Sequence, residues 1–254
     1  MRYHIITFLL MLCGVLLGLV STSAHATIIH VGLTDASGST SWTSPTIGDP
    51  HGTVTLSGWE YDNGNWASAA MYYKNSGGAE TGMGLYCNSF GLNLAHNRCS
   101  QHEIGSTPWQ MLDLNISKLT DWSSLTFYLG SINGTSYGDG GGANGDETGY
   151  LLGAQCTVGG KCAAPIVLGS CTDFGSNGSQ TCSFTFSADY LLRLGITDIW
   201  VTPSRTNPDG TSNANILFGS SFDLQVPEPA ELGIFGFGIL LIGLFLGLRR
   251  RKAA

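Results

Sequence analysis

Six cysteines give this 254-residue chain its clearest capacity for covalent chemistry once Cys13, in the N-terminal apolar stretch, is set aside. They fall into near neighbours separated by short loops: Cys87 with Cys99, Cys156 with Cys162, and Cys171 with Cys182. Sequence alone does not fix the connectivity, but this spacing favours three local disulfides, each worth about 2 to 3 kcal/mol by chain entropy. A metal site on Cys156, Cys162 and Cys171 with a histidine is the alternative, although CTVGGKC lacks the spacing of zinc knuckles.

Two polar stretches could hold a metal ion. LAHNRCSQHEIG brings together His96, His102 and Glu103, and its other interpretation is a polar surface loop. SYGDGGGANGDETG offers oxygen ligands for calcium at Asp139, Asn144, Asp146 and Glu147. The spacing is not that of an EF-hand, and GGANGD matches one imperfect Gly-Gly-x-Gly-x-Asp repeat. We therefore favour a loop between strands and predict no metal or other cofactor.

Catalytic motifs do not appear in the sequence, which contains neither G-x-S-x-G nor H-E-x-x-H. The best acids for a hydrolase or lyase are Glu60, Asp62 and Glu103, which are scattered. Residues 27 to 225 contain six basic and 16 acidic residues, a formal charge near −10. So acidic a segment is not expected to bind nucleic acid. We predict a protein that is not an enzyme, with a secreted polysaccharide-active hydrolase or lyase as the alternative.

Aromatic residues are concentrated between positions 42 and 73, and such rings can stack on sugars in carbohydrate-binding sandwiches. Strand alternation places Trp59 and Tyr61 on one face. We expect most of the group to pack in the hydrophobic core. The group comprises Trp42, Trp59, Tyr61, Trp66, Tyr72 and Tyr73.

Short runs of β-branched and aromatic residues alternate with turn residues along the chain, which predicts strands. The predicted strands are 27–33, 53–61, 66–74, 109–117, 124–132, 183–187, 197–203 and 215–226. Asp62-Asn63-Gly64-Asn65 indicates a hairpin, and ADYLLRLG (188–195) a short helix ended by Gly195. Strands of this length, with only 11% charged residues, predict an all-β, antiparallel, jelly-roll-like β-sandwich.

The N-terminus has the features of a secretory signal peptide. Arg2 precedes an apolar stretch from Ile5 to Val20, and Ala24-His25-Ala26 fits the A-x-A pattern for cleavage between Ala26 and Thr27. An N-terminal membrane anchor is the alternative. Export to an oxidising compartment agrees with the even number of remaining cysteines.

The C-terminus contains a Pro-Glu-Pro motif, then an apolar span, and then a group of cations. Pro227, Glu228 and Pro229 follow the last predicted strand, because proline cannot donate to a sheet. Residues 232–248 are 17 uncharged residues that form a helix of about 25 Å, just long enough to cross a bilayer. The cations Arg249, Arg250, Arg251 and Lys252 would hold its end in the cytoplasm. The alternative is a plain single-span anchor.

VPEPA, the Gly- and Leu-rich span and RRRK together resemble the PEP-CTERM sorting signals of Gram-negative bacteria. The resemblance covers 29 residues, 226–254, and implies recognition of Pro227, Glu228 and Pro229 by exosortase, a membrane-embedded cysteine protease or transpeptidase-like enzyme. It also implies a precursor held transiently in the inner membrane and delivery to the cell surface or exopolysaccharide matrix. The chain then divides into a signal peptide (1–26), a β-sandwich ectodomain (27–225) and a sorting signal (226–254).

A second resemblance lies within the ectodomain. GMGLYCNSF (82–90), HEIG (102–105) and QMLDLNISKL (110–119) are similar to the strand succession of jelly-roll bodies that carry this sorting signal, with His102 where an acidic residue is common. The sequence therefore predicts an exported surface or matrix protein, handled by the secretion machinery and exosortase. Its expected role is structural or weakly glycan-binding in a biofilm, with exopolysaccharide as a candidate partner.

Overall fold

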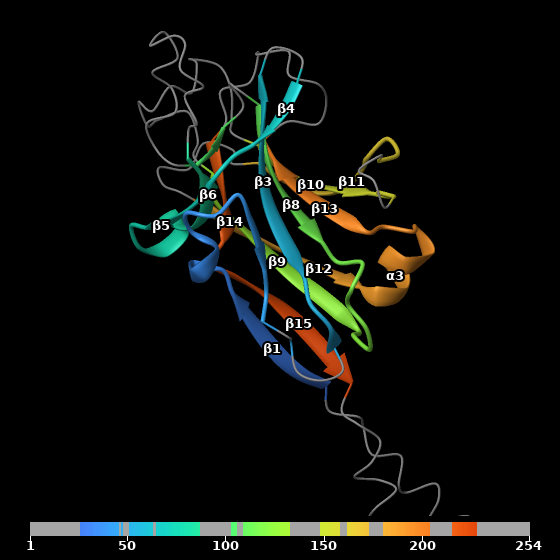
Figure 1. Cartoon of the computed structure of the whole chain (residues 1–254). Helices are drawn as coiled ribbons and strands as arrows, with labels where there is room; N and C mark the ends of the chain where they lie inside the picture. The colour runs from blue at the N-terminus through green and yellow to red at the C-terminus, as the bar shows by residue number, and fades with distance from the viewer. Residues whose placement is uncertain are drawn as a thin grey trace, which may run out of the picture. The chain divides into compact units, whose positions relative to one another are not determined.

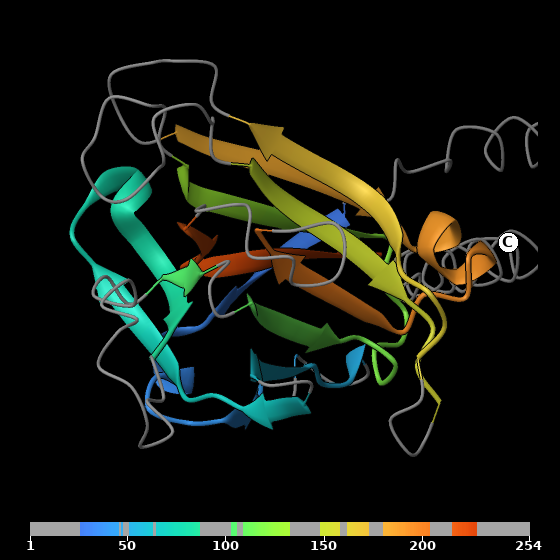
Figure 2. The same ribbon diagram turned by 90° about the horizontal axis from the view of Figure 1, so that it is seen from above.

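The computed structural model describes residues 26–45, 47, 51–62, 65–86, 103–105, 109–132, 148–157, 162–172, 180–203 and 215–227. Described residues between Ile28 and Val226 belong to one compact unit, in which two antiparallel sheets form a β-sandwich (Figures 1 and 2). The predicted all-β, antiparallel class is thus confirmed. No helix in these ranges is long and apolar enough to span a membrane, and the predicted span 232–248 lies outside them.

Eight of the described strands make the first sheet, in the order β1-β15-β9-β14-β6-β5, with β12 beside β9 and β7 beside β14. Their bounds are β1 Ala26–Gly32, β15 Ser221–Pro227, β9 Ser124–Ile132, β14 Asn215–Gly219, β6 Thr81–Leu85, β5 Met71–Asn75, β12 Gln180–Ser187 and β7 Ile104–Gly105. Because β14 and β15 both pair with β9, the predicted strand 215–226 is two strands interrupted at Ser220.

Seven further described strands make the second sheet, in the order β11-β10-β13-β8-β3-β2, with β4 beside β3. Their bounds are β11 Ile166–Thr172, β10 Thr148–Ala154, β13 Asp198–Thr202, β8 Trp109–Asn115, β3 Thr55–Asp62, β2 Ser41–Thr43 and β4 Asn65–Ser68. The predicted hairpin is present, since β3 and β4 pair up to Asp62 and Asn65.

The predicted single strand 66–74 is wrong, because β4 and β5 belong to different sheets. After β4 the chain stays beside β3 as far as Ala69, whose backbone N–H donates to the Gly58 carbonyl and which is fully buried. Ala69 and Ala70 are small enough to allow this passage between the sheets. Because neither residue is Gly or Pro, the sequence does not mark the break between the two strands.

Alternate residues of each strand fill the space between the sheets. Phe127 of β9 packs against Phe218 of β14 and Phe222 of β15, with ring centroids 6.0 and 6.3 Å away. Leu112 and Leu114 of β8 face them from the second sheet and are likewise fully buried. This pattern leaves the intervening residues of β8 and its neighbours on the outer face of the second sheet.

Local closures complete the fold. A disulfide joins Cys171 of β11 to Cys182 of β12 and so links an edge of one sheet to an edge of the other.

The helix α3 (Ala188–Arg193) begins where the Ser187 hydroxyl accepts a hydrogen bond from the Tyr190 N–H. It lies at the opposite end of the sandwich from β5 (Figure 2). The predicted helix 188–195 is therefore confirmed, and its last predicted residue, Gly195, has a φ of +65°.

Candidate functional site

The outer surface of the seven-stranded sheet carries a group of aromatic and polar side chains from four strands. Trp59 and Tyr61 alternate with core residues on β3, as Asp113 does on β8 and Trp200 on β13. Trp66 of β4 is the Cα partner of Tyr61 and is 39% exposed. We call the outer surface formed by Trp59, Tyr61, Trp66, Met111, Asp113 and Trp200 the aromatic face.

Asp113 lies at the middle of one row across this sheet. Its Cα partners are Ser57 on β3 and Trp200 on β13, and Trp200 in turn faces Leu152 on β10. Met111 and Leu152 are nearly inaccessible to solvent, yet they lie outside the main hydrophobic core. The carboxyl of Asp113 is therefore placed among apolar side chains on the outer side of the sheet.

The surroundings of Asp113 shift its ionisation. Its pKa is raised from 3.8 to about 7, first because burial penalises the charged carboxylate and second because the Asp198 carboxylate is nearby. The Trp200 indole N–H, a hydrogen-bond donor beside the carboxyl, opposes the shift by a smaller amount. Asp113 Oδ1 and Trp200 Nε1 are both buried, and neither has a partner at regular hydrogen-bond geometry within the described part of the chain. A buried acceptor and a buried donor on cross-strand partners complement each other, so the two side chains form a weakly bonded polar pair between β8 and β13.

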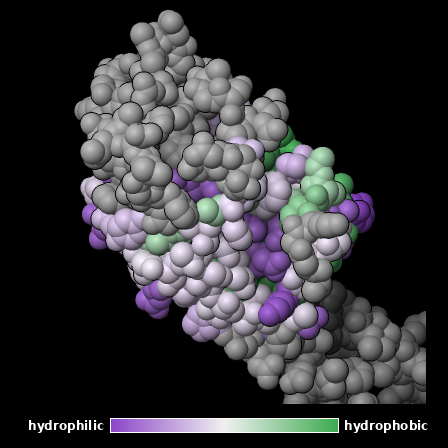
Figure 3. Space-filling view, turned by 45° about the horizontal axis from the view of Figure 1, so that its top comes forward, coloured by the Kyte–Doolittle hydropathy of each residue, from purple (hydrophilic) through white to green (hydrophobic). Residues whose placement is uncertain are grey.

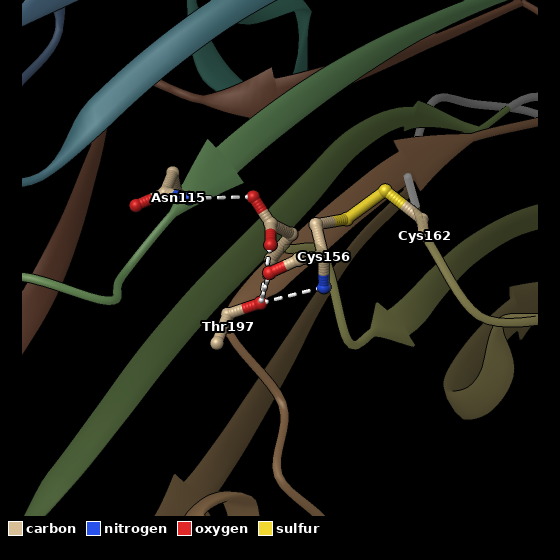
Figure 4. The surroundings of a disulfide bond; sticks show 5 residues. Asn115, Cys156, Cys162 and Thr197 are labelled. Atoms are coloured by element: carbon tan, nitrogen blue, oxygen red, sulfur yellow. Dashed lines mark hydrogen bonds between the residues drawn. A yellow bond between two sulfur atoms is a disulfide. The ribbon is translucent and has the colours of Figure 1, made fainter. Parts of the chain in front are cut away.

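Asp198, in contrast, is hydrogen-bonded on both oxygens, to the Asn115 and Thr197 side chains that Figure 4 labels. Its Oδ1 accepts from Asn115 Nδ2 at 2.7 Å, and its Oδ2 accepts from Thr197 Oγ1 at 2.5 Å. The Thr197 hydroxyl also accepts from the Cys156 N–H at 2.9 Å, next to the Cys156–Cys162 disulfide. Asp198 therefore connects β8 and β13 to the disulfide loop and influences Asp113 only through its charge.

The aromatic residues divide between the core and this outer surface. Trp42 and Tyr73 pack against the core as expected. The expectation is wrong for Trp59 and Tyr61, because alternation along β3 gives the core face to Leu56 instead. The Tyr61 ring meets Trp66 edge to face, with centroids 5.2 Å apart. Alternation showed that Trp59 and Tyr61 share a face but could not show which face is the core.

Aliphatic residues are exposed elsewhere on the same sheet. Strongly hydrophobic colour gathers at the right-hand side of Figure 3, the side on which Figure 1 places β11. On β11, Ile166 and Val167 are 42% and 44% exposed. The strands β10 and β13 separate β11 from β8 and Asp113. The aromatic face and the aliphatic edge strand are therefore separate surface features.

The acids predicted for catalysis occupy other environments. Glu60 is buried on β3 and accepts a hydrogen bond from Gln110 Nε2 at 3.0 Å. Glu103 is also buried; its Oε1 accepts from Lys74 Nζ and from Ser131 Oγ. The backbone of Asp62 belongs to β3, and its side chain lies outside the described part. Glu60 is hydrogen-bonded to a residue of β8, whereas Glu103 is hydrogen-bonded to residues of β5 and β9. Because both carboxylates are buried in separate networks, Glu60 and Glu103 do not form the pair across a groove that a hydrolase needs.

Some of the remaining predicted site residues lie within the described part of the chain, and others do not. The pairs Cys156–Cys162 and Cys171–Cys182 form as their spacing favours. Ala26 and Thr27 begin β1, and Pro227 ends β15. No group of three or more potential metal ligands occurs in the ranges that the structure describes. Outside those ranges lie Cys87, Cys99, His96, His102, Asp139, Asn144, Asp146, Glu147, Glu228, Pro229, Arg249, Arg250, Arg251 and Lys252.

Asp113 and Trp200 are the functional candidates that the sequence did not indicate. Each lies within a predicted strand, 109–117 or 197–203, but nothing local shows that the two strands are neighbours. The available signal was the position of Asp113 between Leu112 and Leu114, which marks a carboxyl on the face opposite two core residues.

Comparison with known proteins gives little further information. The chain matches no protein-family model and no curated protein. Among solved structures it is similar to the K2 cleaved adhesin domain of Lys-gingipain (Kgp), at 12% sequence identity and a TM-score of 0.27. That alignment covers 79% of this chain and 96% of the adhesin domain. A similarity at this level does not establish a shared fold or function.

Proposed function

We propose that this chain is an exported cell-surface or exopolysaccharide-matrix protein that exosortase sorts through residues 226–254. Its β-sandwich, of jelly-roll type, has a structural or weak glycan-binding role in the extracellular matrix. The precursor is held in the inner membrane by residues 232–248 until the tail is processed. The observation that carries this proposal is the order of Pro227-Glu228-Pro229, apolar span and cations in a chain that also begins with a signal peptide pattern.

The disulfides support export independently of the tail. Cys156–Cys162 and Cys171–Cys182 both form between residues close in sequence, and such bonds persist in oxidising compartments outside the cytoplasm. The second bond also joins the two sheets, so its loss in a reducing compartment would weaken the sandwich itself.

Replacing Pro227, Glu228 and Pro229 together by alanine tests the sorting proposal. We expect the variant to accumulate as an uncleaved precursor in the inner membrane, because exosortase no longer recognises its motif. Membrane fractionation and immunoblotting of the producing cells measure this. The matched control is Pro165→Ala, which changes an exposed proline ahead of β11 and should leave processing unchanged. Normal processing of the triple variant would contradict the proposal.

The alternative, a secreted polysaccharide-active hydrolase or lyase, is disfavoured at two of its three candidate carboxylates, because Glu60 and Glu103 are buried in hydrogen bonds. Release of reducing or unsaturated ends from the producer's own exopolysaccharide would favour it over the matrix role.

A further inference from the structure

We propose that, in the precursor, the end of the β-sandwich from which the C-terminal segment departs binds the headgroup surface of the phospholipid bilayer. This inference rests on the proposed sorting function. It adds a lipid-binding surface, which fixes the orientation in which the Pro-Glu-Pro motif is presented to exosortase. We call this surface the exit end; it comprises Ile28, Lys118, Tyr190, Leu192 and Arg193.

Backbone hydrogen bonds place helix α3 beside the last residues of β15. The Ser123 N–H donates to the Gln225 carbonyl at 2.8 Å, and the Ala188 N–H donates to the Ser123 carbonyl, also at 2.8 Å. Ala188 begins α3, and Gln225 directly precedes Val226, the last residue of the compact unit. The exposed side chains of α3 therefore lie close to the point at which the chain leaves the sandwich.

The length of chain after Val226 keeps the exit end close to the bilayer. The predicted membrane span begins at Leu232, and six residues reach at most about 20 Å when fully extended. The headgroup layer takes up about 5 to 7 Å of that reach. Val226 then stays within about 15 Å of the headgroup surface, a gap too small for a folded domain of about 30 Å. Lipid is the partner that this short connection selects.

Large apolar side chains are exposed at the exit end. Within the described ranges, Tyr190 and Leu192 of α3 are 40% and 65% exposed, and Ile28 is 56% exposed. Ile28 is the third residue of β1, which lies beside β15, and Figure 1 shows the start of β1 next to the end of β15. A tyrosine ring with its polar hydroxyl and an exposed leucine suit the boundary between headgroups and hydrocarbon.

The charge of the exit end also suits a bilayer surface. Residues 27 to 225 contain six basic and 16 acidic residues, so most of the ectodomain is repelled by anionic headgroups. The turn after β8 belongs to the exit end, because the Ile116 N–H donates to the Thr197 carbonyl shortly after α3. The exposed charged residues of this turn and of α3 are Lys118, Asp121, Asp189 and Arg193. Two cations balance two anions here, so this end meets little of that repulsion.

Photo-crosslinking of the precursor to lipid tests the proposal. The full precursor, purified from the inner membrane of cells that lack exosortase, is reconstituted in vesicles of phosphatidylethanolamine and phosphatidylglycerol. The photoreactive residue benzoylphenylalanine replaces Tyr190 or Leu192, and mass spectrometry measures the lipid adducts. The matched control position is Trp66, which is 39% exposed and pairs with Tyr61 at the far end of β3. We expect about fivefold more lipid adduct at 190 and 192 than at 66.

A charge substitution measures the contribution of the apolar contact. Leu192→Asp should lower the adduct yield at position 190 about threefold, because a carboxylate is unfavourable at the lipid interface. Trp66→Asp is the matched control and should leave that yield unchanged. Both side chains are exposed, and circular dichroism checks that each variant is folded.

Vesicle flotation, read first, separates the two proposals. A precursor that does not float with the vesicles would contradict the proposed membrane span and this inference together. Flotation with adduct yields at 190 and 192 no higher than at 66 would overturn lipid binding by the exit end alone. Adducts to a second protein chain in place of lipid, or an unchanged yield in Leu192→Asp, would overturn it as well.

Discussion

The outer faces of the two sheets each carry an aspartate at the middle of a row, and the two aspartates are in opposite situations. On the eight-stranded sheet, Asp223 Oδ1 lies 2.6 Å from His30 Nδ1, and its Oδ2 accepts from the Tyr128 hydroxyl at 2.8 Å. On the seven-stranded sheet, Asp113 Oδ1 is buried and makes no hydrogen bond within the described residues. Both oxygens of Asp223 have a side-chain partner, whereas the carboxyl of Asp113 is buried and its charged form is penalised.

The neighbours of each aspartate explain the difference. Asp223 has Thr126 as its Cα partner, and the Thr126 hydroxyl lies 2.9 Å from that of Thr185, so the row consists of mutually bonded polar groups. Asp113 has an indole beside it and Met111 nearby on its strand. Hydroxyl rows stabilise a sheet, whereas apolar side chains around a carboxyl penalise its charged form. The contrast therefore separates a face whose central carboxylate is fully hydrogen-bonded from a face whose central carboxyl is buried.

Replacing Asp113 by asparagine should produce the largest effect. The folded-state pKa of Asp113, about 7, exceeds the ordinary value of 3.8, so the folded protein binds the proton more tightly than the unfolded chain. Ionisation of the buried Asp113 therefore lowers the free energy of unfolding of the wild type by its full amount above pH 7 and by part of that amount between pH 4 and 7. Below pH 4 it has no effect. At pH 8 we expect Asp113→Asn to raise the free energy of unfolding by about 2 to 4 kcal/mol.

Urea denaturation of the wild type and Asp113→Asn at several pH values between 4 and 8 measures this difference, with the disulfides kept oxidised. Subtraction removes the contribution of groups that titrate alike in both proteins. Asp198 on β13 is the charged neighbour, and the β3 partner, Ser57, does not titrate. A difference independent of pH would show that Asp113 is not buried as described, and the two faces would then no longer differ.

The same substitution at Asp223 should have the opposite sign. Asp223→Asn removes the charge that His30 and Tyr128 contact, so we expect a loss of about 1 kcal/mol at neutral pH. The effect is modest because the His30 side chain is 73% exposed and solvent screens the pair. The same denaturation series measures it. Stabilisation by both Asp→Asn variants would remove the distinction between the faces.

Much of the fold was predictable because its signals are local. The strand 124–132, the hairpin at Asp62 and Asn65, the helix at 188 and the pairing of Cys171 with Cys182 each depend on neighbouring residues. The candidate site was not predictable, since it exists only where β8 lies beside β13. Alternation along β8 places Asp113 and Leu112 on opposite faces of the sheet. Only the packing of the two sheets shows that the face with Leu112 is the one that points into the core.

The smallest predicted effect concerns Tyr128, the other partner of Asp223. Its pKa is raised, first by its hydrogen bond to Asp223, then by burial and by the charge of that carboxylate. Tyrosinate absorbance should therefore show Tyr128 ionising at lower pH in Asp223→Asn than in the wild type, with Tyr128→Phe subtracted in each background to isolate it. Tyr128→Phe should cost only about 0.5 to 1 kcal/mol, because the lost hydrogen bond is partly exposed to water. An unchanged titration would mean that Asp223 does not engage Tyr128 in solution, and the comparison would then rest on the contact between Asp223 and His30.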